Sequence, residues 1–380
     1  MQSGASTFVE AFIGGRTALH EDRRPKRPDC PILNRVRMKQ FHPAKGRPGG
    51  ELALLAEIRA RAGSSLGGGL RLGIGDDCAL IRPRWGEEIA VTTDLSIAGR
   101  HFRLDWHPPE AVGHRTLARG LSDLAAMGAR PVAAFLSLGL PRELTRAAGR
   151  KRSWVQRFLD GFLALAEAHR TPLAGGDLAE SPLAVADIVL VGALPRGGAL
   201  LRSGARAGDL LYVTGALGGA AAGLARLAEL AEAARERTAP PRIPAKLADL
   251  LAPHLYPQPR IAQGLWLRRR AVATAALDVS DGLSTDLAHL CRDSGVAAEV
   301  DAGLLPLDAT ATLAQALHGG EDYELLFTAP PTARVPRSIA GVAVTRIGRV
   351  LRRRVGQPAA TLLTPQGPRP LEARGWEHFC

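Results

Sequence analysis

The sequence lacks the features that would place it at once in a membrane, disulfide-stabilised or zinc-binding class. Its 380 residues contain only four cysteines, Cys30, Cys78, Cys291 and Cys380, and no CxxC pair. Neither a disulfide framework nor a zinc site of that spacing is therefore expected, and a reducing, cytoplasmic setting fits best. No uninterrupted run of about 18 apolar residues is present, which argues against a transmembrane helix and a membrane partner.

The common nucleotide-binding signatures are missing as well. There is no GxxxxGK[ST] motif, which excludes a P-loop, and no HRD and DFG pair, which excludes the protein-kinase fold. The segment GIGDDC (73–78) lacks the third glycine and the spacing of a dinucleotide-binding fingerprint. If the chain binds a nucleotide, it does so by another route.

Aromatic residues are scarce, at 4%, whereas positive charge is abundant, with a formal net charge of +12. Such an excess suits an anionic partner, either nucleic acid or phosphorylated small molecules. About half of the excess lies in residues 1–50, a Pro-, Gly- and Arg-rich stretch that predicts a disordered extension. Elsewhere the arginines stand singly, without the interleaved aromatics of a platform for single strands. No nucleic-acid partner is expected, and binding through residues 1–50 stays the weaker alternative.

Periodic sequence begins at residue 51, and a Gly-rich turn near residue 198 precedes a second set of elements. We therefore predict domains over 51–198 and 199–380, with residues 1–50 as the extension. Helical and strand-like segments alternate in both, which indicates an α/β or α+β fold with mixed sheets covered by helices. Helices are predicted over 51–62, 110–127, 144–169, 216–234, 260–270 and 282–294, and a Pro-rich link over 239–259. Strands are predicted over 88–94, 132–140, 184–194, 209–215, 273–280, 297–303 and 323–328.

The most informative feature is a set of acidic residues in Gly- or Ser-flanked turns beside apolar segments. Mg²⁺ prefers hard oxygen ligands and is held by a few carboxylates together with substrate phosphates. Glycines beside such carboxylates let backbone N–H groups approach phosphate oxygens. The acids are Asp76, Asp77, Asp94, Asp123, Asp177, Asp278, Asp281, Asp286, Glu321 and Asp322.

Each motif alone has a simpler explanation. A single Asp–Gly pair is more often a turn or a helix cap than a metal ligand. Asp123 would then face solvent on its helix, and Asp286 would be an ordinary acid in the first helical turn. The recurrence of acidic turns on an otherwise basic chain favours the metal–phosphate interpretation.

Taken together, the motifs resemble those of the thiamine-monophosphate kinase family, which belongs to the aminoimidazole ribonucleotide synthetase and selenophosphate synthetase superfamily. They follow the family's order from about residue 51 to the C-terminus, and GGEDYELLFT with VSDGL is the most diagnostic pair. The matching segments are GIGDDCAL, TTDLSIAGRHF, LSDLAAMGARP, AGGD, LLRSGARAGD, LDVSDGLSTDLAHL and GGEDYELLFT.

The resemblance implies two α/β domains of the superfamily's type, a homodimer, and Mg²⁺- and ATP-dependent conversion of thiamine monophosphate to thiamine diphosphate. By motif match, the metal ligands would be Asp77, Thr92, Thr93, Asp94, Asp123, Asp177, Asp278 and Asp281. ATP contacts would come from Gly176, Asp177, Arg202 and Ser280, and contacts to the thiamine phosphate from His101, Glu321 and Trp376. Because the acceptor is already an anionic phosphate, alignment and charge neutralisation would suffice without a strong general base.

The sequence departs from the family's pattern at a few positions. Leu178 stands where a threonine is expected after GGD, and Arg100 precedes His101 in place of a small or acidic residue. The chain ends in Cys380, and the hydrogenase-maturation branch of the superfamily also ends in a cysteine. The hydrogenase-maturation activity and the selenophosphate synthetase activity remain the alternatives. The tail EHFC lacks the C-terminal motif of the hydrogenase-maturation branch, and Cys78 does not lie where the reactive cysteine of selenophosphate synthetase is expected.

Overall fold

The computed structural model describes residues 51–62, 69–74, 78–147, 151–233, 240 and 242–377. These residues all lie in one compact unit that spans residues 43–380. The predicted extension over residues 1–50 and the predicted metal ligand Asp77 lie outside the described residues, as does Cys380. The division into domains at residue 198 stays a prediction.

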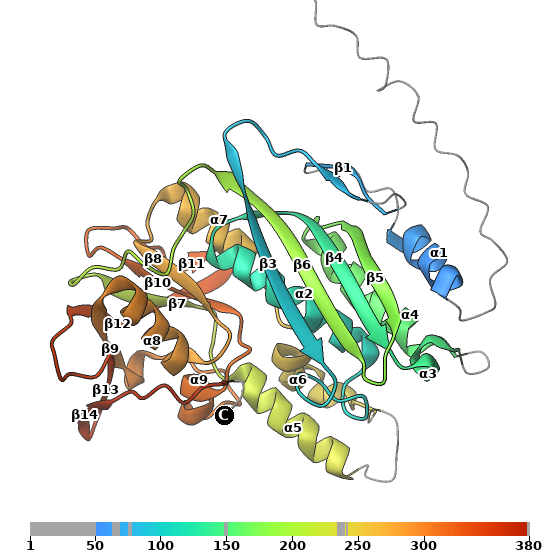
Figure 1. The fold of residues 1–380 in the computed structure, drawn as a ribbon. Helices are drawn as coiled ribbons and strands as arrows, with labels where there is room; N and C mark the ends of the chain where they lie inside the picture. Colours follow the sequence, from blue (N-terminus) through green and yellow to red (C-terminus); the bar gives the residue numbers. More distant parts are fainter. Residues whose placement is uncertain are drawn as a thin grey trace, which may run out of the picture. The chain divides into compact units, whose positions relative to one another are not determined.

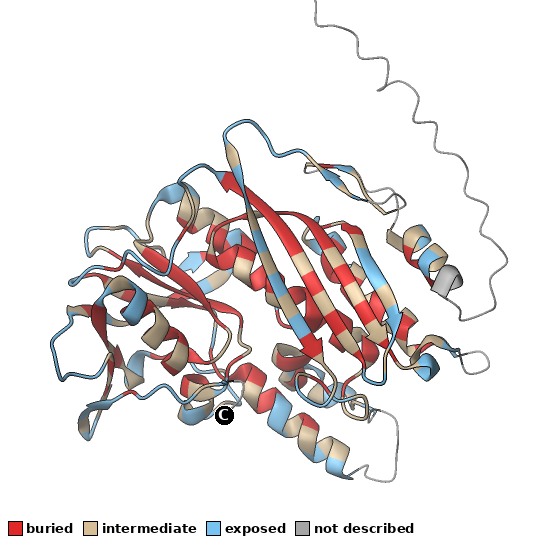
Figure 2. Cartoon of the chain, viewed as in Figure 1, coloured by how far each residue is buried: buried red, intermediate tan, exposed pale blue. Residues whose placement is uncertain are grey.

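The first large sheet has four strands in the order β3 (Glu87–Ile97), β6 (Val185–Pro195), β4 (Arg130–Leu140) and β5 (Leu173–Glu180). Its strands pair antiparallel except β4 and β5, which are parallel and therefore need the crossover helix between them. Helices α2 (Pro109–Ala126) and α4 (Trp154–Ala168) lie behind this sheet in Figure 1. The residues of β6 that face them are buried (Figure 2).

Helix α2 is the central element of the fold, and 15 of its 18 residues are buried. It crosses α4 closely because two glycines face the partner backbone. A Cβ on Gly113 would lie 1.9 Å from the Phe158 carbonyl oxygen, and one on Gly161 would lie 1.8 Å from that of Glu110. The prediction of one helix over 144–169 is wrong at its start. The chain forms α3 (Arg142–Thr145) and begins α4 afresh after Ser153, whose side chain caps the new helix in a capping box.

The second large sheet runs in the order β14, β13, β9, β12, β7, β10, β8, with β11 paired to β12. Only the β13–β9 pair is parallel, so the sheet is mixed, as the sequence predicted. Its strands are β7 (Leu210–Thr214), β8 (Ala275–Val279), β9 (Val296–Asp301), β10 (Glu324–Ala329), β11 (Ser338–Ile339), β12 (Val342–Arg352), β13 (Ala360–Thr364) and β14 (Gly367–Pro370).

The remaining elements are short or connect the sheets. They are α1 (Glu51–Ala62), β1 (Leu70–Leu72), β2 (Leu80–Ile81), α5 (Gly219–Ala233), η1 (Ala245–Leu247), α6 (Ala248–Leu255), α7 (Ile261–Arg270), α8 (Leu283–Ser294), η2 (Ala302–Leu304) and α9 (Leu313–His318). The predicted Pro-rich link is wrong over 245–255, where η1 and α6 form and Pro253 sits inside α6. The predicted positions of the other helices and strands are confirmed to within a few residues.

Buried side chains from both halves of the sequence pack together in one core. One cluster of buried side chains joins Leu117 of α2 and Ile188 of β6 to Ala276 of β8 and Phe327 of β10. Helix α2 therefore packs against both large sheets, and its C-terminal half lies where they meet. Among the described residues, no helix has the length and apolar character needed to cross a membrane.

Candidate active site

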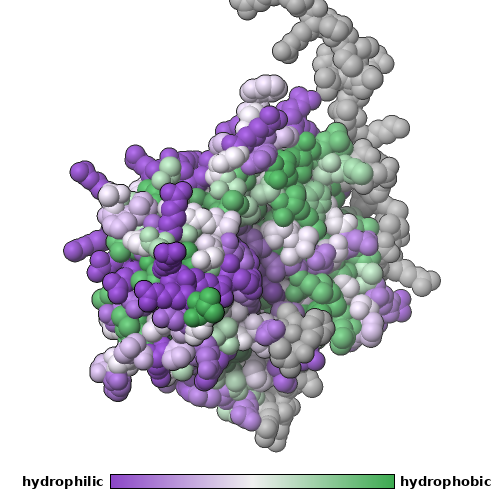
Figure 3. All heavy atoms as spheres, turned by 60° about the vertical axis from the view of Figure 1, so that its left-hand side comes forward, coloured by the Kyte–Doolittle hydropathy of each residue, from purple (hydrophilic) through white to green (hydrophobic). Residues whose placement is uncertain are grey.

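A cavity of about 450 Å³ opens where α2 meets the second sheet. The space-filling view in Figure 3 shows a hydrophilic hollow flanked by apolar surface. Side chains from both halves of the sequence line the cavity. Eight of the predicted site residues are among them: Asp94, His101, Asp123, Asp278, Ser280, Asp281, Glu321 and Trp376.

The carboxylates at one end of the cavity come from three separate elements, and two of them accept hydrogen bonds from neighbouring hydroxyls. Asp94 lies on β3, Asp123 on α2, and Asp278 on β8. The Thr92 hydroxyl donates a hydrogen bond to Asp123 Oδ2, and the Ser122 hydroxyl donates to Asp278 Oδ2 at 2.6 Å. Thr92, itself a predicted ligand, is thus a hydrogen-bond partner of the predicted ligand Asp123. Its side chain lies on the same face of the sheet as that of Asp94.

Burial and mutual repulsion make these acids reluctant to ionise. Burial, together with the nearby charges of Asp123 and Asp281, raises the pKa of Asp94 to about 6 against the opposing effect of Arg119. Burial and the charge of Asp123 raise the pKa of Asp278 to about 7. Burial also raises the pKa of Asp123. The negative charges of carboxylates gathered in this way repel one another, and a bound cation would balance them.

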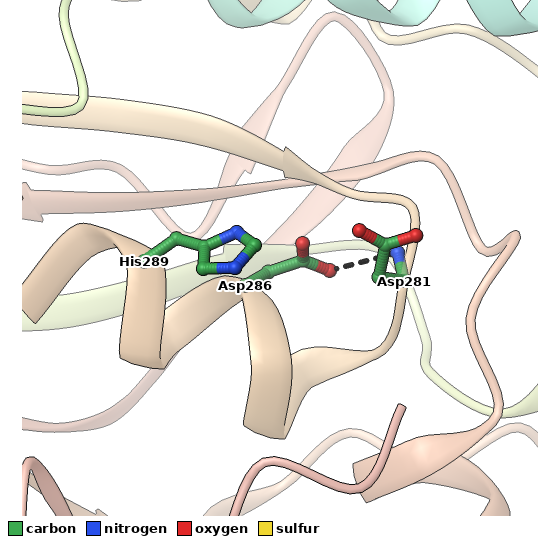
Figure 4. Close-up of side chains that lie close together, drawn as sticks. All are labelled: Asp281, Asp286 and His289. Atoms are coloured by element: carbon green, nitrogen blue, oxygen red, sulfur yellow. Dashed lines mark hydrogen bonds between the residues drawn. The ribbon is translucent and has the colours of Figure 1, made fainter. Parts of the chain in front are cut away.

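The loop that follows β8 and the first half of α8 together carry a second group of potential ligands (Figure 4). Ligand atoms of Asp281, Asp286 and His289 all lie within 4.8 Å of one another. Asp286 Oδ2 accepts hydrogen bonds from the backbone N–H groups of Ser280, Asp281 and Gly282 at 3.0–3.1 Å. Asp286 therefore fixes the loop that presents Asp281, which agrees with its interpretation as an acid of the first helical turn.

Backbone hydrogen bonds join three distant segments at the rim of the cavity. The Glu321 N–H donates to the Ser280 carbonyl at 2.7 Å, and the Trp376 N–H donates to the Asp281 carbonyl at 2.9 Å. The Gly375 N–H donates to the Thr285 hydroxyl at 2.9 Å. Trp376, with half of its surface exposed, is therefore held beside Asp281 although 95 residues separate them in the sequence.

His101 has a defined orientation at the cavity. Its Nδ1 accepts a hydrogen bond from the Ile97 N–H at 3.1 Å, so its ring proton is on Nε2 when the side chain is neutral. In that tautomer Nε2 is a donor, as recognition of a phosphate oxygen requires.

Four other predicted residues are not among those that line the cavity. Successive residues of a strand point to opposite faces, so Thr93 points away from the face of Thr92 and Asp94. The registered row Leu95, Asp187, Ser137 and Asp177 crosses all four strands of the sheet and places Asp177 on the face of Thr93.

Gly176 has a local structural reason to be glycine, because its φ is +147° and a Cβ would lie 1.8 Å from the Leu136 carbonyl oxygen. Arg202 is exposed, but its charge lowers the pKa values of Asp123 and Asp278, which places it near the acidic end. The roles of Thr93, Asp177, Gly176 and Arg202 stay predictions.

Sequence reasoning missed two arginines that line the cavity. Arg115 and Arg119 precede Asp123 at intervals of four residues on α2, so all three lie on one helical face. Arg119 Nη2 lies 3.5 Å from Asp94 Oδ1, and Arg115 Nη2 lies 2.7 Å from both carboxylate oxygens of Glu321. The i, i+4, i+8 spacing along the predicted helix was the signal that could have found them.

Comparison with known proteins identifies the class of this chain and then its family. Residues 75–194 match the N-terminal domain, and residues 206–358 the C-terminal domain, of AIR synthase related proteins. The chain is 38% identical over 344 residues to the thiamine-monophosphate kinase of Escherichia coli K12, covering 87% of this chain and 98% of that protein. It belongs to the thiamine-monophosphate kinase family.

Comparison with solved structures supports the same family. The crystal structure of thiamine-monophosphate kinase from Stenotrophomonas maltophilia K279a is 39% identical, with a TM-score of 0.69, covering 82% of this chain and 96% of that one. A structure described as AaThiL complexed with AMPPCP and TMP is 31% identical, with a TM-score of 0.64, covering 87% and 97%. The hydrogenase-maturation protein HypE, at 16% identity and a TM-score of 0.63, shares the fold alone.

Proposed function

We propose that the protein transfers the γ-phosphoryl group of ATP to thiamine monophosphate, forming thiamine diphosphate and ADP in thiamine diphosphate biosynthesis. The observation that carries this proposal is the cavity that joins buried and half-buried carboxylates to His101, Glu321 and Trp376. The family supports the same reaction, and the AaThiL complex holds AMPPCP and TMP together. The much lower identity to HypE, 16%, gives the hydrogenase-maturation alternative less support.

The donor set fits Mg²⁺. Asp94, Asp123, Asp278 and Asp281 offer oxygen ligands, which are the ligands Mg²⁺ prefers. The raised pKa values of Asp94 and Asp278 have the physical cause expected of acids that await a cation. When bound there, Mg²⁺ would neutralise the triphosphate and polarise the transferring group.

In the reaction, an oxygen of the acceptor phosphate bonds to the γ-phosphorus while the bond from that phosphorus to the β,γ-bridging oxygen breaks. The acceptor is an anion at neutral pH, so no proton has to be removed before it attacks. His101, donating from Nε2, would orient the acceptor phosphate. Trp376 and Glu321 would receive the cationic thiazolium ring, since aromatic faces and carboxylates both attract cations.

The assay that tests this function compares acceptors. Purified protein is incubated with Mg²⁺, ATP and either thiamine monophosphate or free thiamine, and the thiamine species are separated. We expect thiamine diphosphate from the monophosphate alone, and none when EDTA exceeds the Mg²⁺. A folded preparation that forms no diphosphate would exclude the kinase function, and the substrates of the sister enzymes would then be tested for ATP turnover.

We also infer that the protein is a cytoplasmic homodimer. The face of the four-stranded sheet opposite α2 carries three exposed apolar side chains on β3: Ile89, Val91 and Leu95, at 42%, 60% and 45% exposure. Apolar side chains clustered on one face favour association with a second copy. Light scattering should give twice the chain mass for wild type, and Val91→Glu should shift the protein towards monomer. A monomeric wild type would contradict the inference.

A further inference from the structure

On one wall of the cavity, three buried side chains from separate segments form a hydrogen-bonded group that ends at the Glu321 carboxylate. Arg115 lies on α2, His254 on α6, and His107 in the loop before α2. Their exposures are 6%, 2% and 2%, whereas the Glu321 side chain, which Arg115 and His254 contact, is 31% exposed. A buried arginine needs a counter-charge and buried histidines need hydrogen-bond partners, and this group supplies both.

The hydrogen bonds define which nitrogen carries each proton. His254 Nε2 lies 2.7 Å from Arg115 Nη1 and 3.0 Å from His107 Nε2. A guanidinium only donates, so His254 Nε2 is an acceptor and carries no proton. His107 must then donate from Nε2, which leaves its Nδ1 to accept from the Arg103 N–H at 3.1 Å. The single proton of His254 lies on Nδ1, 3.7 Å from Glu321 Oε2.

This environment favours the neutral form of both His107 and His254. Burial lowers the pKa of His254 well below its ordinary value, and the charge of Arg115 lowers it further. Burial likewise lowers the pKa of His107, to about 3. At neutral pH both histidines are therefore neutral, and Arg115 and His107 share the single lone pair of His254 Nε2.

Arg115 reaches both predicted substrate contacts at once. Its Nη2 lies 2.7 Å from each oxygen of Glu321 and donates to the His101 carbonyl at 3.4 Å. Glu321 itself has a φ of +59°, a left-handed conformation that is costly for a side chain with a Cβ. Such a conformation persists only where its surroundings hold it, and Arg115 and the Ser280 carbonyl do so from two sides.

We propose that Arg115, held in place by His254 and His107, is a positioning residue that fixes the Glu321 carboxylate and the His101 backbone for recognition of the thiamine moiety. The proposal rests on the function proposed above. It assigns no chemical step to the three residues: although they line the cavity, they are hydrogen-bonded to one another and to Glu321, and their proposed effect on the substrate passes through Glu321 and His101. Their loss should weaken binding of thiamine monophosphate and leave binding of ATP unchanged.

The test measures kcat and the KM of each substrate for two pairs of variants. Arg115→Met should raise the KM for thiamine monophosphate at least tenfold with the KM for ATP within twofold, and Arg115→Lys should restore part of the loss. His254→Leu, which leaves two donors unpaired, should raise the same KM about fivefold or more. His254→Gln, whose Oε1 replaces the acceptor, should stay within twofold of wild type.

A matched control separates positioning from stability. Arg157 and Glu110 form a bidentate ion pair, with the arginine Nε and Nη2 at 2.7 and 2.8 Å from the two carboxylate oxygens, between α4 and α2 and outside the cavity lining. Arg157→Met should lower the melting temperature without changing either KM. If wild type forms thiamine diphosphate but Arg115→Met changes the two KM values equally, or His254→Gln behaves like His254→Leu, the positioning proposal is wrong. If wild type forms no diphosphate, it is the proposed function that fails.

Discussion

The Ser122 hydroxyl donates a 2.6 Å hydrogen bond to the Asp278 carboxylate, joining residues that lie 156 positions apart in the sequence. Ser122 precedes the cavity acid Asp123 on α2, and Asp278 is the next-to-last residue of the buried strand β8. This contact fixes the spacing of two acids that belong to different halves of the chain. It also favours the ionised form of Asp278 against the effect of burial.

Replacing Ser122 by alanine should therefore weaken the response to Mg²⁺. A hydrogen bond to a charged group contributes about 1.5–3 kcal/mol, so the Mg²⁺ concentration for half-maximal activity should rise roughly tenfold or more. Thr116→Val is the matched control, because the Thr116 hydroxyl bonds only to the Val112 carbonyl within the same helix. Equal Mg²⁺ requirements in both variants would contradict the role given to Ser122.

Gly375→Ala should displace the C-terminal segment from the cavity. A Cβ at this position would lie 2.0 Å from the Asp281 carbonyl oxygen, the atom that accepts the Trp376 N–H. We expect the KM for thiamine monophosphate to rise at least about tenfold, since loss of an aromatic–cation contact costs about 0.5–2 kcal/mol and the backbone shifts as well. Gly303→Ala, whose Cβ would meet only the Asp301 side chain at 3.3 Å, should have little effect.

The dependence of stability on pH should reverse when Mg²⁺ is added. In the metal-free protein, the pKa values of Asp94 and Asp278 are raised to about 6 and about 7. The folded state then binds more protons than the unfolded state between about pH 4 and 7, so these groups reduce stability as the pH rises through that window. Bound Mg²⁺ requires both acids ionised and releases their protons.

The increase in melting temperature that Mg²⁺ and AMPPCP produce should accordingly be larger at pH 8 than at pH 5.5. Differential scanning fluorimetry at both pH values measures it, with EDTA as the metal-free reference. An increase that is the same at both values would mean that these acids do not bind the ion.

Arg119→Met should tighten the binding of Mg²⁺ at pH 8. Arg119 Nη2 lies 3.5 Å from Asp94 Oδ1, and its positive charge opposes a second cation at the same carboxylate. The side chain is 20% exposed, so the repulsion is partly screened and we expect roughly a threefold lower half-saturating Mg²⁺ concentration. Arg130→Met removes the arginine paired with Glu87, at the end of β3 remote from Asp94, and should leave that concentration unchanged. A higher Mg²⁺ requirement in Arg119→Met would show that Arg119 assists the metal.

Much of the fold and the cavity could be predicted from the sequence because the acids follow strongly periodic apolar segments. Asp94 and Asp278 lie on strands that alternation or continuous burial identifies, and the motif order made Trp376 a candidate before its contact with Asp281 was known. Local patterns could not place Asp177 on the opposite face of the sheet from Asp94, because that depends on strand register.

The features that the sequence did not predict depend on long-range contacts. The Arg115–His254 contact spans 139 residues, and α6, which carries His254, lies in a proline-rich segment with weak helical signals. The break before α4 depends on a cap at Ser153 that a single amphipathic pattern over 144–169 obscures. Neither feature follows from local propensity, since tertiary packing decides both.

The most direct test of the account is transfer of γ-labelled phosphate in a single turnover, with Asp281→Asn and Asp293→Asn as a matched pair. Asp281 lines the cavity, whereas Asp293, near the far end of α8, pairs with its neighbour Arg292. We predict label in thiamine diphosphate for wild type and Asp293→Asn, and a rate at least about 100-fold lower for Asp281→Asn. Undiminished transfer by Asp281→Asn, or no transfer by folded wild type, would contradict the account.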